Sequence, residues 1–335
     1  KKYVAKIAKY KINTANTFKL GEICFVSYGL RLNSDKYDKD FKFKKEDLLS
    51  EARTQLNNRI YTEGKYLEEY VITRELYVEW GSDRCPKRLV RATFPELYDQ
   101  PKLLMSRQKG IVAFSDQNHV CDNTIIVGVL AKDLATVDNS NIRKYYGNLK
   151  VNRKQIEDNS RNFDLKYLLA LLNSALIRYF IKYNSEGKFD TYPDDWKKIP
   201  IKKISLEEQT SYAIEADSLL SLNKEFFSQK ARFLVIISNE FNITLTAKLN
   251  NFTELTFESF TQEIEKISKV SLSLTKKDEM LDYFDKYKNS LLLLKSQIQS
   301  VQKRLDDRIF RLYDVDENSQ NIVEFDLNTD SKKAK

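Results

Sequence analysis

The sequence contains few of the residues from which metal centres, disulfides and proton relays are built. Its three cysteines, Cys24, Cys85 and Cys121, are far apart and form no CxxC pair. Neither a zinc ribbon nor a disulfide framework is therefore encoded, and a reducing, intracellular setting follows. The single histidine, His119, has no second histidine with which to share a metal ion or a proton. We interpret Cys121 beside it as a chance neighbour rather than a catalytic partner.

Membrane spans and phosphate-binding loops are also missing from the sequence. No apolar run reaches the length that crosses a bilayer, and the lysine-rich start lacks the apolar core of a signal peptide. A cytoplasmic location is therefore predicted. No glycine-rich phosphate loop occurs, and none of the GxGxxG, GxSxG and HExxH motifs. We predict that this chain by itself has no catalytic residue, metal ligand or cofactor.

One short segment is similar to the acidic pair and lysine with which nucleases hold Mg²⁺. It contains Asp194, Asp195 and Lys197. Metal-binding carboxylates are expected on adjacent strands, whereas these crowd into one loop, so a structural or DNA-facing loop is favoured. A stand-alone metal-dependent nuclease that uses these three residues stays an alternative.

The charge balance is moderately basic. The 335 residues are enough for two or three domains, and 56 Lys and Arg against 48 Asp and Glu give a formal charge of +8. Such an excess suits a polyanionic partner, because Lys and Arg replace the counterions condensed along a phosphate backbone. Lysines that only solvate helix faces produce the same excess, so charge alone does not decide for nucleic acid.

The first 160 residues or so have the composition of strands, with aromatic and β-branched residues between short polar breaks. Five runs predict strands, at 23–28, 69–73, 76–80, 110–114 and 124–130. The polar stretch 44–59 predicts a helix. We expect a mixed α+β domain with a curved or barrel-like sheet.

The apolar spacing changes near residue 164. Asp164 is expected to cap a helix that runs to residue 181, with Phe163 and Leu168 placed as a hydrophobic staple. Because this helix is apolar nearly all round, it should be buried against the sheet. After a polar loop, Ser205 and Glu208 form a capping box that predicts the start of a long helix.

Two later segments have apolar residues at spacings of three, four and seven, which favours a coiled-coil-like seam. They are Leu219, Leu222, Phe226, Phe233 and Ile237, and then Leu291, Leu294, Ile298, Val301, Leu305, Ile309 and Leu312. A short helix is predicted near 256–267 between them, so the long helices, each about 50 Å, should pack antiparallel. We predict a β-rich domain over 1–204, a helical spacer over 205–325 and a disordered tail over 326–335.

Several short motifs follow one another in a defined order. The first are Tyr-Thr-Glu-Gly-Lys-Tyr at 61–66, Glu69-Tyr70, Tyr-Val-Glu-Trp at 77–80, Pro-Glu-Leu-Tyr-Asp-Gln-Pro-Lys at 95–102 with Leu103, Leu104 and Arg107, Ala113, Asp116, and Asn-Thr-Ile-Ile at 123–126. Further on come 168–174 with Tyr179-Phe180, Tyr192-Pro193, Ile-Pro-Ile at 199–201, Glu208-Gln209, 298–306 and Leu-Tyr-Asp at 312–314. Over about residues 15–325 this order resembles the C-terminal target-recognition region, the TaqI-like specificity domain, of type IIG restriction–modification enzymes. Asp314 stands where such proteins usually have glycine.

The resemblance implies sequence-specific binding of double-stranded DNA. Enzymes of this family join a nuclease, an S-adenosylmethionine-dependent adenine methyltransferase and this recognition region in one chain. The methyltransferase motif Asn-Pro-Pro-Tyr is absent here, so S-adenosylmethionine and Mg²⁺ are expected in the parent enzyme only. The chain begins with Lys1, and we interpret it as a fragment that works with methyltransferase and nuclease domains of the same or a partner chain.

Two other readings stay open. One is a type I-like specificity subunit that acts with separate methyltransferase and restriction subunits, although such subunits usually carry two recognition regions. The other is a structural coiled-coil protein that does not bind DNA.

Contacts with the DNA backbone are predicted for two cationic groups between strands, where a rigid sheet can aim flexible side chains. They are Arg84, Lys87, Arg88 and Arg91 after Trp80, and Arg107 with Lys109. Ordinary solvation explains any one of these residues equally well. The interpretation requires both groups to lie on the same side of the domain.

Base readout is predicted for three loops, because Arg pairs with guanine and Asn or Gln with adenine in the major groove. The candidates are Arg31, Asn33, Ser34 and Asp35 in the first loop, Gln117, Asn118 and His119 in the second, and Lys188 with Tyr192 in the third. The family resemblance places the first loop near DNA.

Overall fold

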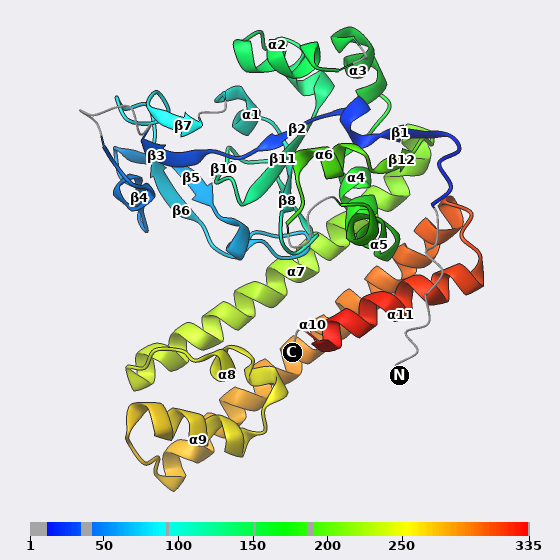
Figure 1. Cartoon of the computed structure of the whole chain (residues 1–335). Helices are drawn as coiled ribbons and strands as arrows, with labels where there is room; N and C mark the ends of the chain where they lie inside the picture. Colours follow the sequence, from blue (N-terminus) through cyan, green and yellow to red (C-terminus); the bar gives the residue numbers. More distant parts are fainter. Residues whose placement is uncertain (1–11, 35–41, 92–93, 150–151, 186–189, 334–335) are drawn as a thin grey trace, which may run out of the picture. The chain divides into compact units, whose positions relative to one another are not determined.

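The computed structural model describes residues 12–34, 42–91, 94–149, 152–185 and 190–333 (Figure 1). Strands occupy the first two thirds of the chain and long helices follow, so the predicted α+β class is confirmed. Contacts divide the chain into two compact units. The first, which we call the sheet unit, comprises residues 1–217 and 304–335, and the second, the helical unit, comprises residues 218–303.

The sheet unit contains two four-stranded sheets and two ribbons. In spatial order the main sheet consists of β2 (Cys24–Tyr28), β11 (Ile125–Leu130), β8 (Lys102–Ser106) and β9 (Val112–Ser115), all antiparallel. The second sheet consists of β10 (Val120–Cys121), β5 (Asn57–Thr62), β6 (Leu76–Glu79) and β4 (Leu49–Ser50). The ribbons are β3 (Arg31–Ser34) with β7 (Leu89–Arg91) and β1 (Thr17–Lys19) with β12 (Pro200–Lys202). In the part of the chain that the structure describes, no sheet closes, so the expected barrel-like sheet is not found.

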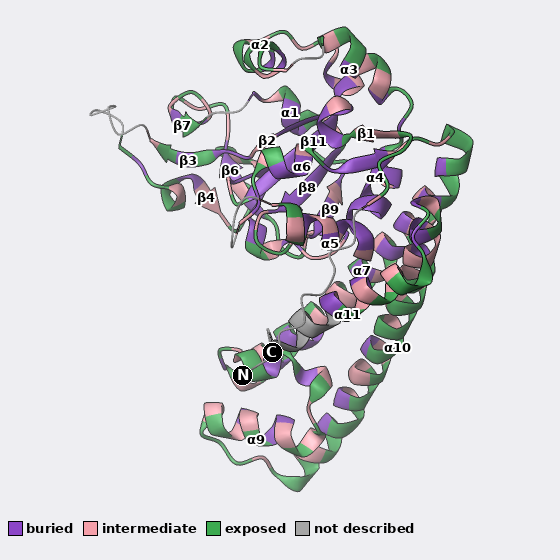
Figure 2. Cartoon of the chain, turned by 45° about the vertical axis from the view of Figure 1, so that its right-hand side comes forward, coloured by how far each residue is buried: buried purple, intermediate pink, exposed green. Residues whose placement is uncertain are grey.

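Strand β11 is a central strand of the main sheet, and its buried side chains stabilise the sheet unit. All six of its residues are buried, between β2 on one side and β8 on the other (Figure 2). Its Ile, Val and Leu residues, interrupted only by Gly128, suit a strand that is covered on both faces, because each buried aliphatic side chain contributes roughly 1.5–3 kcal/mol.

Gly29 lets the chain leave this sheet between β2 and β3. A Cβ atom there would lie 2.2 Å from the carbonyl oxygen of Asp122 and 2.5 Å from that of Cys121. The Gly29 N–H donates to the Ile125 carbonyl at 2.9 Å, and the Leu30 N–H donates to the Cys121 carbonyl at 2.8 Å. This close backbone approach fixes where the β3–β7 ribbon begins.

The predicted buried helix is present but consists of two helices, α4 (Leu165–Leu172) and α5 (Ala175–Asn184). Asp164 caps α4 as predicted, accepting from the backbone N–H groups of Lys166 and Tyr167. The break has a local cause, since the Ser174 hydroxyl caps α5 by accepting from the Ile177 N–H, and a tertiary one. The side-chain amide of buried Asn173 accepts from the Val112 N–H at 2.9 Å and donates to the Val112 carbonyl at 2.8 Å, so it pairs with the edge of β9.

Two local predictions were wrong. The stretch 44–59 is not a helix, because β4 and the start of β5 both pair with β6, and strand pairing overrides local helix propensity. The run 69–73 is not a strand. Tyr70 has a positive φ of 71° and makes one isolated bridge to Ala113.

The remaining short helices of the sheet unit are α1 (Glu96–Asp99), α2 (Ser140–Gly147), α3 (Arg153–Ser160) and α6 (Pro193–Lys197). Short 3-10 turns occur at Leu20–Glu22, Lys45–Leu48, Gly64–Tyr66 and Ala131–Leu134.

The two long helices are α7 (Leu206–Phe241) and α10 (Leu274–Leu312), with α8 (Ala247–Asn250), a 3-10 turn at Phe252–Glu254 and α9 (Phe257–Ser268) between them. The capping box at Ser205 and Glu208 starts α7 as predicted. Contacts between α7 and α10 run antiparallel, from Glu240 with Lys276 to Gln229 with Ser290, so the predicted pairing is confirmed.

The core of the helical unit is aromatic. Phe233 of α7 stacks on Phe252 with ring centroids 4.1 Å apart, and Phe260 of α9 lies 4.8 Å from Phe284 of α10. Of the helices in the described residues, none combines the length and apolarity needed to cross a membrane.

The predicted domain boundaries differ from the compact units. The end of α10 and helix α11 (Glu317–Lys333) belong to the sheet unit, together with the start of α7. Asp306 accepts from the Ala175 N–H at the start of α5, and Asp326 binds Lys182 at 2.5 Å and Tyr183 at 2.8 Å. The tail predicted to be disordered from residue 326 is therefore helical to Lys333.

Asp314 lies just after α10 with a positive φ of 55°. The Val315 N–H donates to the Phe310 carbonyl at 3.0 Å, which is the bond of a helix-ending turn that favours glycine in the left-handed position. Asp314 therefore occupies a backbone conformation that glycine adopts more readily. Here Asn13 and Lys202 bind the Asp314 carboxylate.

We predict that Gly29→Ala destabilises the sheet unit by about 2–3 kcal/mol, because the added methyl group meets backbone oxygens that cannot move aside. Urea denaturation followed by circular dichroism measures this. Gly147→Ala is the control, since no atom lies within 4 Å of a Cβ atom at that position. Equal stability of the two variants would contradict the close approach.

Candidate nucleic-acid interface

One arginine from each of the two predicted cationic groups lies against the same aromatic ring. The guanidinium carbon of Arg91, from β7, lies 5.0 Å from the ring centroid of Tyr28, and that of Arg107, after β8, lies 5.4 Å from it. Arg107 also lies 5.7 Å from the ring of Tyr192. Two arginines and two tyrosines from four segments therefore form one cluster, which we call the Tyr28 cluster. Arg91 and Arg107 lie on the same side, as the DNA-binding interpretation requires.

The β3–β7 ribbon adds a third arginine. Arg31 is directly opposite Arg91 in the antiparallel register, and both side chains are exposed. Asn33 is exposed and Leu32 buried, so Arg31 and Asn33 point to the same outer face. Among the residues that the structure describes, neither Arg31 nor Arg91 forms an ion pair. Like charges directly opposite each other destabilise a sheet, and within the described residues no carboxylate forms an ion pair with either arginine.

Arg107 is held more firmly than the ribbon arginines. Its side chain, 18% exposed, contacts Asp190 at 3.0 Å and donates to the Asn123 carbonyl at 3.1 Å. The Thr191 N–H donates to the Arg107 carbonyl at 2.8 Å. Arg107 thus fixes the segment that carries Tyr192, whose side chain is 42% exposed. It positions an aromatic surface, while its own charge is largely neutralised by Asp190.

The Tyr28 phenol stays protonated at neutral pH. Burial raises its pKa, and the guanidinium groups of Arg107 and Arg91 only partly offset this effect. A neutral phenol between two cations keeps its hydroxyl hydrogen, so it can donate to an acceptor such as a phosphate oxygen.

Three predicted DNA contacts have structural partners. Arg84 binds Glu79 through two nitrogens, and Glu79 is only 2% exposed, so Arg84 neutralises a buried carboxylate. Lys109 donates to the Leu67 carbonyl at 2.7 Å and contacts Glu68 at 2.8 Å. The Ser34 hydroxyl bonds the backbone of Phe43. These interactions explain the three residues without a ligand.

The predicted readout loop at Gln117 and Asn118 is exposed but lies away from the Tyr28 cluster. It is held at the start of β8, where Lys102 donates to the Gln117 carbonyl, whereas Arg107 follows the end of β8. From Lys102 to Arg107 the chain advances by five residues, or about 17 Å at roughly 3.4 Å per residue. The structure does not bring this loop together with the ribbon.

Within that loop His119 has a structural role. Its Nδ1 lies 2.8 Å from the Ser115 hydroxyl and its Nε2 lies 2.8 Å from Glu75, so both ring nitrogens are engaged and no cysteine is bonded to the ring.

The other predicted residues are spread. Lys87 is exposed, and its ammonium nitrogen lies 3.4 Å from an Asp83 carboxylate oxygen. Arg88, the next residue, is half-buried. Lys188 and Asp35 lie outside the described residues.

The segment that is similar to a nuclease site is the start of a helix. Asp195 is buried and accepts from the Tyr192 N–H at 2.8 Å, which caps α6, and Asp194 pairs with Lys197 on the surface. The described part of the chain contains no group of three or more His, Cys, Asp or Glu that is arranged to hold a metal ion. The geometry favours a capped helix over a nuclease centre.

Comparison with protein families identifies one match. Residues 205–309 match a family described as a domain of unknown function (DUF8810). The matched segment contains α7, α8, α9 and most of α10. None of the curated proteins matches the chain.

Sequence reasoning missed Tyr28. The sequence shows only an aromatic residue at the end of a predicted strand, immediately before glycine. Its place in a cationic cluster depends on Arg91 and Arg107, which are far away in the sequence and lie against its ring in the fold. Sequence spacing does not contain that information.

We predict that the stability of the sheet unit depends on pH through Lys102. Burial lowers the pKa of Lys102 to about 8 from 10.5. Between pH 8 and pH 10.5 Lys102 binds more protons in the unfolded chain than in the folded one. Its contribution to the free energy of unfolding therefore rises with pH in this range. Relative to Lys102→Met, the wild type should gain about 2 kcal/mol between pH 7 and pH 9.5. Urea denaturation of both proteins at both pH values measures the difference, and a pH-independent difference would count against a buried amine.

Proposed function

We propose that the chain binds double-stranded DNA in a sequence-specific way, as the specificity region of a type IIG-like restriction–modification enzyme. The observation that supports this most is the Arg31–Arg91 pair with Tyr28 against Arg91, three residues from three strands, because neither arginine forms an ion pair among the residues that the structure describes. A protein that uses these arginines only for solubility would gain nothing from opposing them. An anionic partner between them removes the repulsion.

The β3–β7 ribbon has the right form for a DNA groove. The major groove admits a two-stranded ribbon, and Arg and Asn side chains there pair with guanine and adenine. Arg31 and Asn33 project from one face of β3 without side-chain partners among the described residues, so their donors are available to base edges. The ring of Tyr28 packs against Arg91 of the ribbon. The exposed ring of Tyr192, in the same cluster, offers a surface on which a sugar or base can stack.

Methylation and cleavage, in this proposal, belong to other domains of the same or a partner chain. Those domains supply S-adenosylmethionine binding and Mg²⁺, while this chain supplies the target sequence. The resemblance of the motifs at 61–126 and 168–201 to target-recognition regions supports this division of labour.

We expect duplex binding to weaken steeply as salt increases, since phosphate contacts release counterions. Fluorescence anisotropy with a labelled pool of random-sequence duplexes measures the slope of log affinity against log salt. Replacing Arg31 and Arg91 by Gln should reduce that slope by about 1–2. The control replaces Arg143 and Arg161, two exposed arginines on other elements, by Gln. If wild-type protein binds no duplex, the proposed function fails.

The ribbon's role in readout predicts a separate effect. Arg31→Lys keeps the charge but loses the planar fork that binds guanine, so affinity for random duplexes should stay within about twofold. Discrimination against a substituted guanine in the preferred site should fall by about 5- to 100-fold. Selection of preferred duplexes from a random pool, followed by binding of single-base variants, measures this. Retained discrimination in Arg31→Lys would place the readout elsewhere.

A further inference from the structure

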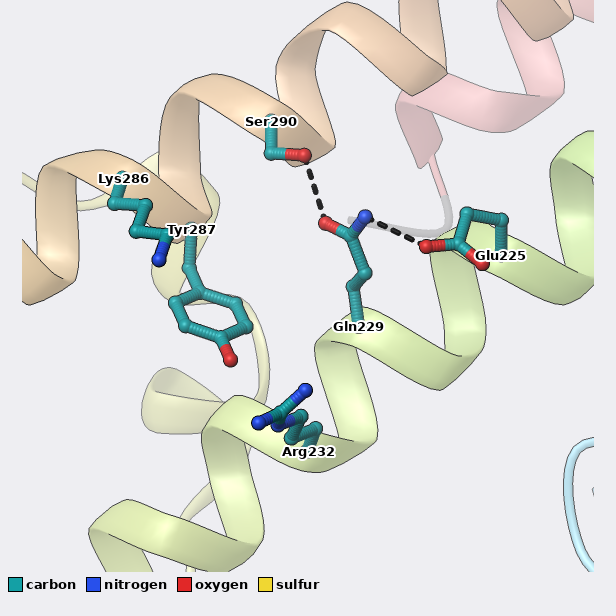
Figure 3. Close-up of a pocket in the computed structure, with 6 residues that line it drawn as sticks. All are labelled: Glu225, Gln229, Arg232, Lys286, Tyr287 and Ser290. Carbon is teal, nitrogen blue, oxygen red and sulfur yellow. Dashed lines mark hydrogen bonds between the residues drawn. The ribbon is translucent and has the colours of Figure 1, made fainter.

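The helical unit contains a polar cavity between α7 and α10. It has a volume of about 280 Å³ and is lined by Glu225, Gln229, Arg232, Lys286, Tyr287 and Ser290 (Figure 3). The first three residues come from α7 and the others from α10, so both long helices form the cavity. It lies wholly within the helical unit.

One side of the cavity is a fixed hydrogen-bonded chain. The Ser290 hydroxyl donates to the Gln229 side-chain oxygen at 2.7 Å, and the Gln229 amide nitrogen donates to Glu225 at 2.8 Å. Figure 3 shows these bonds crossing from α10 to α7. Glu225 is the one carboxylate in the lining, and it is already engaged by an amide.

The other side of the cavity carries two cations that have no counter-charge. Arg232 and Lys286 are exposed, and in the described part of the chain neither forms an ion pair or a side-chain hydrogen bond. The hydroxyl of Tyr287 points toward Arg232 in Figure 3. Arg232 of α7 and Lys286 and Tyr287 of α10 thus line the same cavity, and their guanidinium, ammonium and phenol groups can all donate hydrogen bonds.

The aromatic core beneath the cavity makes it rigid. Tyr287 lies 5.3 Å from Phe233 and 4.9 Å from Tyr283, ring centroid to ring centroid. Burial raises the pKa of Tyr283 to about 12, and the nearby Arg232 opposes that rise. Packing therefore fixes the ring of Tyr287, while Arg232 and Lys286 are exposed beside it.

Charge is unevenly distributed along the helical unit. The segments 218–236 and 283–303, which flank the cavity, contain seven Lys or Arg and two Asp or Glu. The part between them, 237–282, contains five Lys and eight Asp or Glu. The cavity therefore lies in the basic part of the unit, where an anion is attracted over several ångströms.

We propose that this cavity binds a phosphate group of the DNA backbone, so that the helical unit contacts DNA in addition to separating other parts. This inference rests on the proposed function for its source of phosphate. The size agrees, because 280 Å³ is below the range of about 300–1,000 Å³ that holds drug-sized ligands, and each of the six lining side chains carries a polar group. The Arg fork matches two phosphate oxygens, and Lys286 supplies a point charge.

The test replaces Arg232 and Lys286 together by Gln in the full chain. Anisotropy with the random-duplex pool should show roughly three- to tenfold weaker binding at low salt and a salt slope smaller by about 1–2. The effect should be equal for preferred and random duplexes, because a phosphate contact carries no sequence information. The matched control replaces Lys266 and Lys269 of the same unit by Gln, which removes the same charge outside the cavity.

The outcomes separate this inference from the proposed function. If wild type binds duplex DNA and the two double variants behave alike, the cavity does not bind the backbone and the inference is overturned, while the proposed function stands. A second measurement, ³¹P line broadening with inorganic phosphate, tests for a free anion. Saturable binding of phosphate that Arg232→Gln abolishes, without any change in duplex affinity, would also overturn the assignment to DNA.

Discussion

The backbone contact of Gly29 and Leu30 with Cys121, Asp122 and Ile125 determines where the cationic surface of the sheet unit lies. It ends the pairing of β2 with β11 and directs the chain into the separate β3–β7 ribbon. Because Tyr28 is the last residue of β2, its ring stays beside the ribbon and receives Arg91 from across it. A side chain larger than hydrogen at position 29 cannot coexist with this path.

Buried polar groups define the rest of the sheet unit. Asn173 pairs with the edge of β9, Glu79 holds Arg84, and Lys102 holds the Gln117 carbonyl. Each group is costly to bury without its partner, so each fixes the position of one segment relative to another. These partnerships also explain why several cations that look like DNA contacts in the sequence are used inside the fold.

In both units, whether an arginine forms an ion pair separates structural positions from the positions that we propose to contact DNA. Arg84 and Arg107 contact carboxylates and hold segments in place, whereas Arg31, Arg91 and Arg232 form no ion pair within the described residues. In the sheet unit the uncompensated arginines lie on an isolated ribbon, and in the helical unit one lies in a cavity. Cations that form no ion pair within the described residues are the feature that the two proposed contacts share.

The sequence by itself determined the elements whose cause is local. The strands at 23–28, 76–80 and 124–130, the cap at Asp164, the capping box at Ser205 and the antiparallel long helices follow from periodicity and from side chains that bond neighbouring backbone. Only the tertiary structure decided the pairing of Asn173 with Val112, the pairing of β4 and β5 with β6, and the meeting of Arg91 and Arg107 at Tyr28. These features depend on contacts between residues far apart in the chain, and such contacts leave no regular spacing in the sequence.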